Sequence, residues 1–388
     1  MVRKKGIRRT CTVPETWFAM GEERRLMRSP KSMDLDITSR CNLRCKYCFQ
    51  RTSPTDTRTE LPAEEWAAFC KELGDCSVMS VCIGGGEPFI REDLPEIIDA
   101  VVENRMRFSI LSNGGLIGPE IAGYIASTGR CDHVQVSVDG SCPEVHDTLR
   151  GPGSFAGAMR GLRTLQDAGV PVTSRVTIHR YNLDDLENTA RLLLDELGMR
   201  SISTNSTCYL GVARENPDEV ELTTSEFSDA MERSLLLAEK YPGRISAAAG
   251  PLSLGRAFPE MEKARREGRT IPGRGYLTGC GCMWSKLAVR PDGMIVPCNM
   301  LAHIELGRIN RDRLLEVWQG HPDLNRLRNR YIIPLSTFPE CADCPWQMTC
   351  TGNCPASSYT RTGEVFAPSP DGCLKLFLKN GGRIVNLP

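Results

Sequence analysis

Three cysteines near the N-terminal end have the spacing of an iron–sulfur site with one open position. Cys41, Cys45 and Cys48 form a C-x3-C-x2-C run. Three thiolates this close together can bind three irons of a cubane cluster, whereas such clusters normally take four cysteines. A metal site that leaves one position open is typical of catalysis, as it is for zinc. The run therefore predicts a catalytic cluster, and a zinc knuckle is the structural alternative.

A second group of cysteines lies in the C-terminal third of the chain. In chain order it comprises Cys280, Cys282, Cys298, Cys341, Cys344, Cys350, Cys354 and Cys373. Thiols stay reduced in the cytosol, so clustered cysteines there argue for metal binding rather than disulfides. A pair of structural zinc ions is the alternative to iron–sulfur clusters.

The overall composition excludes several classes of function. The formal net charge of the 388 residues is zero, so nothing global argues for nucleic acid or an anionic membrane as partner. No apolar run approaches the ~20 residues of a transmembrane helix. The basic start, residues 2–9, is not followed by the apolar core of a signal peptide. We therefore expect a cytoplasmic protein.

The elements that must position the first site alternate between strand and helix from residue 33 to residue 204. The expected strands are 33–37, 78–83, 107–111, 133–138, 172–178 and 201–204. The expected helices are 62–73, 93–104, 117–127, 154–168 and 184–197. This alternation predicts a parallel sheet with right-handed crossovers. The expected fold class is α/β, a partial (β/α)6 barrel of TIM type with a C-terminal cysteine-rich domain.

Polar and glycine-rich segments follow these strands. In a barrel of parallel strands the loops after each strand gather at one face and carry the chemistry. The segments are the three-cysteine run, Gly84–Pro88, Ser112–Gly114, Ser137–Gly140 and Cys208. Their common placement predicts one site at this face.

The cysteine run together with Gly85-Gly86-Glu87-Pro88 resembles the signature of the radical S-adenosylmethionine (SAM) enzymes. The resemblance implies that the open iron chelates the amino and carboxylate groups of SAM. It also implies that Glu87 and the neighbouring backbone hold the SAM amino group, because a carboxylate accepts charge-assisted hydrogen bonds from an ammonium. Glycines at these positions let the backbone approach a ligand closely.

Further residues resemble positions that place SAM in this superfamily. Ser137 and Asp139 resemble a strand end of the form S-x-D-G, whose serine helps to place SAM. Arg150 is expected to pair with the SAM carboxylate, with a loop salt bridge as the alternative. Asn113 is either a contact of the ribose or methionine, or a turn residue. Arg175 could reach the same site and is not assigned to it.

The C-terminal cysteines resemble the SPASM domain, whose pattern includes G-x4-C, here Gly293 to Cys298, and C-x2-C-x5-C-x3-C. The resemblance implies two auxiliary 4Fe–4S clusters, and hence three in all. Cys298 and Cys354 would bind the first, with Cys280, Cys282 or both. The second would take Cys341, Cys344, Cys350 and Cys373. The C-x-C at Cys280 and Cys282 is tighter than the usual upstream pair, so four-cysteine ligation of the first auxiliary cluster stays open.

The resemblance divides the chain into five parts. They are an N-terminal extension (1–32), the radical SAM barrel (33–210), a bridging helical segment (211–278), the SPASM domain (279–376) and a tail (377–388). Residues 230–237 read as helix and residues 262–269 as a solvated charged face. Residues 1–32 are expected to be too few for the leader-binding module that peptide-modifying relatives often carry.

The implied function is an oxidoreductase that cleaves SAM to a 5′-deoxyadenosyl radical and takes hydrogen from a substrate. Oxidative modification of a ribosomally made peptide is the first hypothesis, with a heme-type tetrapyrrole or another small molecule as alternative. Sulfatase maturation is disfavoured because Asn299 occupies the position where that family often has an aspartate that acts as a base. A non-enzymatic iron–sulfur electron-transfer protein is the alternative of a different class. Flavodoxin or ferredoxin is the expected electron donor.

Cys208 is the candidate catalytic residue outside the clusters. Its expected place at the barrel mouth suits a hydrogen donor or a substrate contact, and an ordinary thiol is the alternative. The sequence does not identify the substrate or the oligomeric state.

Overall fold

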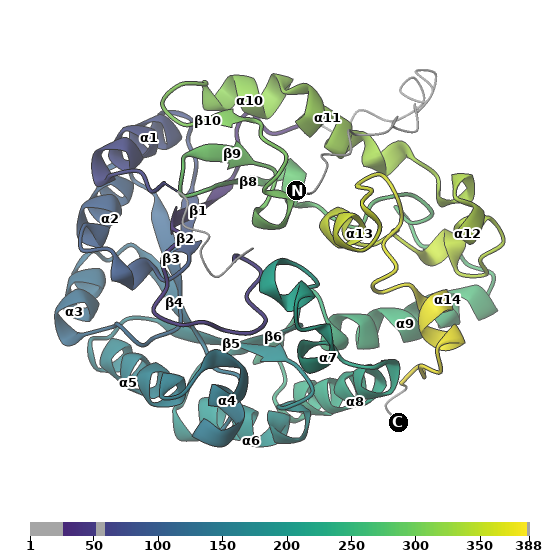
Figure 1. The fold of residues 1–388 in the computed structure, drawn as a ribbon. Coiled ribbons are helices and arrows are strands. Elements are labelled where there is room, and N and C mark those ends of the chain that lie inside the picture. The colour runs from purple at the N-terminus through teal and green to yellow at the C-terminus, as the bar shows by residue number, and fades with distance from the viewer. Residues whose placement is uncertain (1–25, 52–58, 386–388) are drawn as a thin grey trace, which may run out of the picture.

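The computed structural model describes residues 26–51 and 59–385, which form a ring of helices around one sheet (Figure 1). Six parallel strands follow each other in chain order within this sheet. They are β1 (Ser32–Thr38), β2 (Ser80–Gly85), β3 (Arg107–Ser112), β4 (Cys131–Ser137), β5 (Val172–Ile178) and β6 (Ile202–Ser206). The predicted partial barrel is confirmed, with each strand within a few residues of its expected range.

The helices that cover the outside of these strands also lie close to their expected ranges. They are α1 (Ala63–Asp75), α2 (Leu94–Glu103), α3 (Pro119–Ser127), α5 (Ser154–Asp167) and α6 (Leu186–Arg191). Helix α1 buries Trp66, Phe69 and Leu73, which share one helical face. The expected helix 184–197 is divided, because a 3-10 turn precedes α6 and a wider π-type turn, Leu192–Glu196, follows it.

Helix α4 (Pro143–Arg150) was not assigned from the sequence. It begins with a proline, which is favourable at the first helical position because that nitrogen has no helical partner. It ends at Gly151, whose φ of 109° is a conformation that suits glycine. This short helix brings two buried residues, His146 and Arg150, into contact with Asp139.

The sheet continues beyond the six predicted strands at both edges. A two-residue strand, β7 (Ile245–Ser246), pairs with β6 in parallel. On the other side β8 (Lys286–Val289) pairs in parallel with β1, and β9 (Met294–Val296) and β10 (Gly307–Arg308) extend the sheet antiparallel. The C-terminal region thus contributes strands to the sheet of the barrel.

The main core lies between the strands and the outer helices. Met33, Leu35 and Ile37 of β1 are fully buried on the helix-facing side. Successive strand residues point to opposite faces, so Asp34 and Asp36 face the interior of the barrel. The same core continues under α10 (Leu314–Gly320) and α11 (Pro322–Arg328).

The segment between the barrel and the C-terminal region is mainly helical. It contains α7 (Pro217–Val220), α8 (Thr224–Lys240) and α9 (Pro251–Arg266), and α8 includes the predicted helix 230–237. Helix α8 begins with a reciprocal capping box between Thr223 and Glu226. In the part of the chain that the structure describes, no helix is long and apolar enough to cross a membrane.

The charged stretch 262–269 is largely exposed to solvent, as the sequence suggested, and Glu262 is the exception among its charged residues. Glu262 retains 12% side-chain exposure and forms ion pairs with Arg265 and Arg266. Its carboxylate also accepts a hydrogen bond of 2.8 Å from the indole nitrogen of Trp346. Helix α9 therefore contacts the C-terminal region through this hydrogen bond. The helices of the C-terminal region include α12 (Pro339–Ala342), α13 (Pro355–Thr362) and α14 (Leu374–Lys379).

Candidate active site

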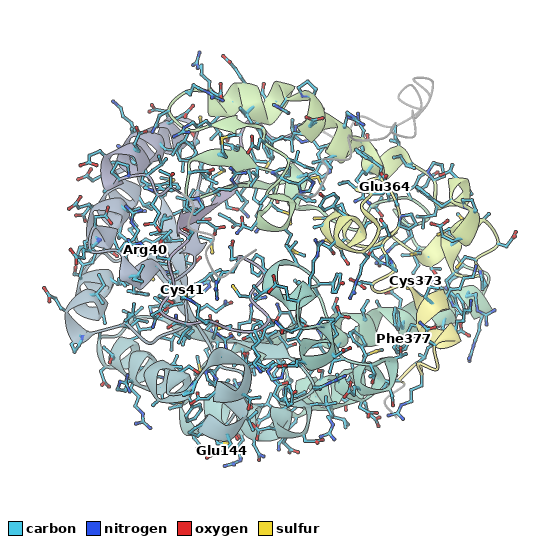
Figure 2. All side chains as sticks on the ribbon, in the orientation of Figure 1. Arg40, Cys41, Glu144, Glu364, Cys373 and Phe377 are labelled. Carbon is cyan, nitrogen blue, oxygen red and sulfur yellow. The ribbon has the colours of Figure 1, made fainter. Side chains whose placement is uncertain are left out.

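A hollow opens at the carboxyl ends of β1 and β2, where the sequence predicts the catalytic face. The hollow is open to solvent, and its volume counted with that open mouth is about 560 Å³. The lining includes Cys41, Cys45, Cys48, Gly85, Gly86 and Pro291. Figure 2 shows Cys41 inside the ring of helices, whereas Glu144 points away from it. The structure thus brings the three-cysteine run and the glycine-rich loop to one place.

The glycine-rich loop is joined to the start of the cysteine run by its backbone. The amide of Gly86 donates to the carbonyl oxygen of Thr38, and the amide of Glu87 donates to that of Arg40, both at 2.8 Å. A Cβ atom on Gly86 would lie only 2.0 Å from the Arg40 carbonyl oxygen. Gly85 has a φ of 114°. The glycines are therefore required for the close approach of the two loops.

The carboxylate of Glu87 is turned into the protein and is fully buried. It accepts hydrogen bonds from the Ser112 hydroxyl at 2.8 Å and from the Asn113 amide at 2.7 Å. Burial raises the pKa of Glu87 to about 7, although these hydrogen bonds act in the opposite direction. The carboxylate has protein partners, and its contact with the SAM amino group stays a prediction.

Asn113 connects the end of β3 with the cysteine run. Its side-chain nitrogen donates to Asn42 Oδ1 at 2.8 Å and lies 3.8 Å from Cys41 Sγ. Its own side-chain oxygen accepts from the Gly115 amide at 2.8 Å, as in a local turn. Asn113 therefore has both the turn geometry and a position beside a predicted cluster ligand.

Arg150 forms a buried ion pair with Asp139 behind the cysteine run. Arg150 Nε donates to Asp139 Oδ2 at 2.6 Å, and both residues are almost entirely buried. The hydroxyl of Tyr47 donates to the same carboxylate, and the guanidinium lies 5.4 Å from the Tyr47 ring centroid. Burial alone would raise the pKa of Asp139, but Arg150, His179 and His146 outweigh it and hold that pKa low. The salt bridge considered for Arg150 is present, and its contact with SAM stays a prediction.

Ser137 and Arg175 lie next to each other on neighbouring strands. They are register partners between β4 and β5. Arg175 Nε donates to Gln135 Oε1 at 3.3 Å, so its side chain lies along the inner face of the sheet. Ser137 ends β4 at the same face as the cysteine run.

The C-terminal cysteines fall into two groups in space. A hydrogen bond with Cys282 is the largest effect that raises the pKa of Cys280, followed by burial, and Cys354 adds a smaller one. Burial raises the pKa of Cys298 to about 12, and Cys354 and Cys282 add to this effect. Cys341 has its pKa raised to about 12 by burial and then by Glu340, Cys350, Cys344 and Cys373. Cys354 thus lies with the upstream cysteines, and both Cys280 and Cys282 lie with it. Within the described ranges, no three Cys, His, Asp or Glu side chains are gathered closely enough to hold a single metal ion.

Two family models match the chain. The model of the radical SAM superfamily matches residues 35–193, and that of the iron–sulfur cluster-binding SPASM domain matches residues 280–345. The chain is a radical SAM enzyme with a C-terminal SPASM domain. The residues gathered at the hollow fit this assignment, because the matched radical SAM segment contains the cysteine run and the glycine-rich loop.

Relatives of this radical SAM enzyme span most of its length. An Fe-coproporphyrin III synthase from Methanosarcina barkeri is 29% identical over 86% of each chain. A PqqA peptide cyclase from Ruegeria pomeroyi is 26% identical over 88% of this chain and 87% of its own. Streptococcus suis SuiB bound to S-adenosylmethionine has the same fold, with a TM-score of 0.69 and 17% identity over 90% of this chain and 78% of its own.

Cys208 lies near Cys354 and Asp371 of the C-terminal region and near Arg175 of β5. Its pKa is raised to about 11 by burial first and then by Cys354 and Asp371. The catalytic role suggested for it stays a prediction. All cysteines in the described residues are free thiols, and Cys11 lies outside them.

Sequence analysis missed several polar residues on the inner face of the barrel. Lys286 of β8 forms an ion pair of 2.6 Å with Asp34 of β1. Asp36 accepts hydrogen bonds from Gln50 at 2.9 Å and from Asn299 at 3.3 Å. The alternation of Asp34 and Asp36 with apolar residues was the available signal, since alternate positions of a barrel strand point inward.

Proposed function

We propose that this enzyme reductively cleaves SAM at a cluster on Cys41, Cys45 and Cys48 and takes hydrogen from a peptide substrate. When bound, the reduced cluster supplies the electron that splits SAM into methionine and a 5′-deoxyadenosyl radical. The protein's part is to bind, orient and exclude water. The observation that carries the proposal is the hollow that the three cysteines share with Gly85 and Gly86.

The backbone holds the cysteine run in place from three sides. The Lys46 amide donates to the Leu149 carbonyl oxygen at 2.9 Å, and the Val212 amide donates to that of Cys48 at 3.1 Å. The third tie is the hydrogen bond from the Glu87 amide to Arg40. Ligands fixed in this way need little reorganisation when a cofactor binds, which favours a defined geometry.

The auxiliary clusters follow the two spatial groups of C-terminal cysteines. We assign the first to Cys280, Cys282, Cys298 and Cys354, and the second to Cys341, Cys344, Cys350 and Cys373. With the SAM-binding cluster this makes three 4Fe–4S clusters. The division into a barrel over 33–210, a bridge over 211–278 and a SPASM domain over 279–376 belongs to the same proposal. Clusters held by these cysteines would supply an acceptor for an electron, which suits an oxidative product.

An anaerobic reconstitution tests the proposal. The protein is loaded with iron and sulfide, reduced with dithionite and given SAM, and 5′-deoxyadenosine is measured. We expect about twelve irons per chain and SAM cleavage. The Cys41/Cys45/Cys48→Ala variant should keep about eight irons and lose cleavage. Bound zinc in place of iron, or iron without 5′-deoxyadenosine, would contradict the enzymatic function.

Two observations support a peptide as the substrate. The inner face of the barrel carries charged and amide side chains, among them Asp34, Asp36, Gln135, Arg175 and Lys286, which suit the hydrogen-bonding groups of a peptide. PqqA peptide cyclases from several bacteria are 24–26% identical to this chain. Incubation with short peptides encoded beside the gene, followed by mass spectrometry, should show the loss of hydrogen from one of them.

A heme-type tetrapyrrole is the second candidate substrate. It is favoured by the 29% identity to the Fe-coproporphyrin III synthase and by a further relative, an AdoMet-dependent heme synthase. Anaerobic assays with iron coproporphyrin, followed by absorbance spectroscopy, separate the two candidates. A change in the porphyrin spectrum that requires SAM would replace the peptide proposal.

The reductant and the compartment complete the proposal. We expect a flavodoxin- or ferredoxin-type protein to reduce the clusters. A cytoplasmic location suits both such donors and the free thiols of the described residues, because the cytosol keeps thiols reduced. Reduction by purified flavodoxin in place of dithionite, with 5′-deoxyadenosine as readout, tests the donor.

A further inference from the structure

Arg330 is a buried cation whose guanidinium has little to pair with. It lies in a short 3-10 turn, Asn329–Ile332, and is 2% exposed. Its Nε atom has no hydrogen-bond partner, and Nη2 donates to the Ala367 carbonyl oxygen at 3.3 Å. No ion pair joins it to any carboxylate in residues 26–51 or 59–385. Burying a charge without a counter-charge costs free energy of folding. A bound anion beside Arg330 would reduce this cost.

The groups that act electrostatically on Arg330 are two of the cysteines assigned to the first auxiliary cluster. Burial lowers the pKa of Arg330 to about 10, whereas Cys354 and Cys280 raise it. The guanidinium therefore remains charged at neutral pH. It lines a narrow cavity together with Cys280, Met283 and Trp284. No acidic residue lines this cavity in the described part of the chain.

A four-thiolate cluster would supply the missing anion. Cysteine ligands bind iron as thiolates, and the resulting centre has a net negative charge that increases by one on reduction. In a buried region of low dielectric, a nearby cation stabilises the more negative reduced form. The charge of Arg330 would therefore make the cluster easier to reduce.

We infer that Arg330 is the counter-charge of the auxiliary cluster on Cys280, Cys282, Cys298 and Cys354 and raises its reduction potential. The inference rests on the proposed cluster assignment. It makes Arg330 a positioning and tuning residue that does not touch the substrate. The reaction concerned is the one-electron reduction of this cluster.

Arg328 provides a matched control in the same cavity. It is equally buried, at 3% exposure, and one of its terminal nitrogens also lacks a partner. Its other nitrogens donate to the Met283 carbonyl oxygen at 3.0 Å and to Asn325 Oδ1 at 2.9 Å, and its guanidinium lies 4.3 Å from the Trp318 ring centroid. Burial lowers its pKa to about 10, and no cysteine counteracts this effect. Arg328 is therefore bound by the protein itself.

The test is an anaerobic redox titration with dithionite, monitored by electron paramagnetic resonance and accompanied by iron counts. It uses reconstituted protein with the Cys41/Cys45/Cys48→Ala changes, so that only auxiliary clusters contribute. Arg330→Met, Arg330→Lys and Arg328→Met are compared in this background. We expect Arg330→Met to lower the reduction equilibrium constant of one cluster at least tenfold, which is about 59 mV for one electron. Arg330→Lys should retain most of the potential, and Arg328→Met should leave both potentials unchanged.

The iron counts decide the case in which a variant loses a cluster. Loss of about four irons in Arg330→Met alone, with Arg330→Lys and Arg328→Met intact, supports a required positive charge. An equal loss of iron in all three variants would show that Arg330 contributes only packing, and it would overturn the inference. Full iron content in Arg330→Met, with reduction equilibrium constants within threefold of those of the parent protein, would overturn it as well. Absence of any auxiliary-cluster signal in the parent protein would instead refute the cluster assignment itself.

Discussion

The two cysteine regions differ in whether a buried arginine beside them is paired with a carboxylate. Beside the first cysteine run, Arg150 is neutralised by Asp139 at 2.6 Å. Beside the first C-terminal group, Arg330 has no carboxylate partner among the described residues. The first region also opens into a hollow, whereas Arg330 lines a narrow cavity. The comparison suggests that one region is built to admit a ligand and the other to hold a charged group permanently.

Removing Arg150 should have the largest effect on the folded state. Arg150→Met leaves Asp139 buried without its counter-charge, and breaking a buried pair in this way costs about 3–5 kcal/mol. Anaerobic urea denaturation measures this loss. The double variant Arg150→Met/Asp139→Asn should recover part of the stability, and no recovery would contradict the role of the pair.

Gly86→Ala should disable the open site without a comparable effect on the C-terminal clusters. The added Cβ would lie 2.0 Å from the Arg40 carbonyl oxygen, so the cysteine run must move. We expect at least a tenfold loss of SAM cleavage and about four fewer irons, by analogy with other geometric disturbances of about 1 Å. Gly118→Ala is the control, since nothing lies within 4 Å of its Cβ position. Normal cleavage by Gly86→Ala would contradict the role of the loop.

Glu87 should make stability depend on pH near neutrality. Burial raises its pKa from the usual 4.5 to about 7 in the folded protein. An acid whose pKa is raised by folding favours the folded state while it is protonated, and this contribution is lost as pH rises toward and through 7. Relative to Glu87→Gln, the wild-type protein should therefore lose on the order of 1 kcal/mol between pH 6 and pH 8. Urea denaturation at these two pH values measures the difference, and an unchanged difference would argue against the raised pKa.

The smallest effect is expected from an exposed ion pair between the cysteine run and α7. Lys46 and Glu219 form a contact of 2.6 Å, but both side chains are more than 40% exposed. Exposed pairs contribute about 0–1 kcal/mol. Lys46→Met should leave iron content and SAM cleavage unchanged and alter stability by less than about 1 kcal/mol. A large loss would show that the surface pair, and not only the buried one, supports the site.

Local patterns predicted the elements of the barrel because each strand and helix carries its own periodicity. The cysteine groups were likewise visible as spacings. The pairing of β8 with β1 was not, because a four-residue strand far along the chain has no local sign of its partner. That Asp139 is the partner of Arg150 was not predicted for the same reason. The sequence placed an amide, Asn299, where a carboxylate was considered, but the structure brings the carboxylate of Asp36 from β1 into hydrogen-bond contact with Asn299.

The parallel pairing of β1 with β8 has a consequence for the order of events during synthesis. Strand β1 ends at Thr38, just before the cysteine run, and leaves the ribosome early, whereas β8 begins only at Lys286. Until then one edge of the nascent barrel presents unpaired backbone groups that invite pairing with other chains. Domains otherwise tend to fold from the N-terminal end as they emerge. In this chain the sheet beside the first cysteine run can be completed only after the SPASM segment has begun to appear, so that edge of the barrel closes late in synthesis.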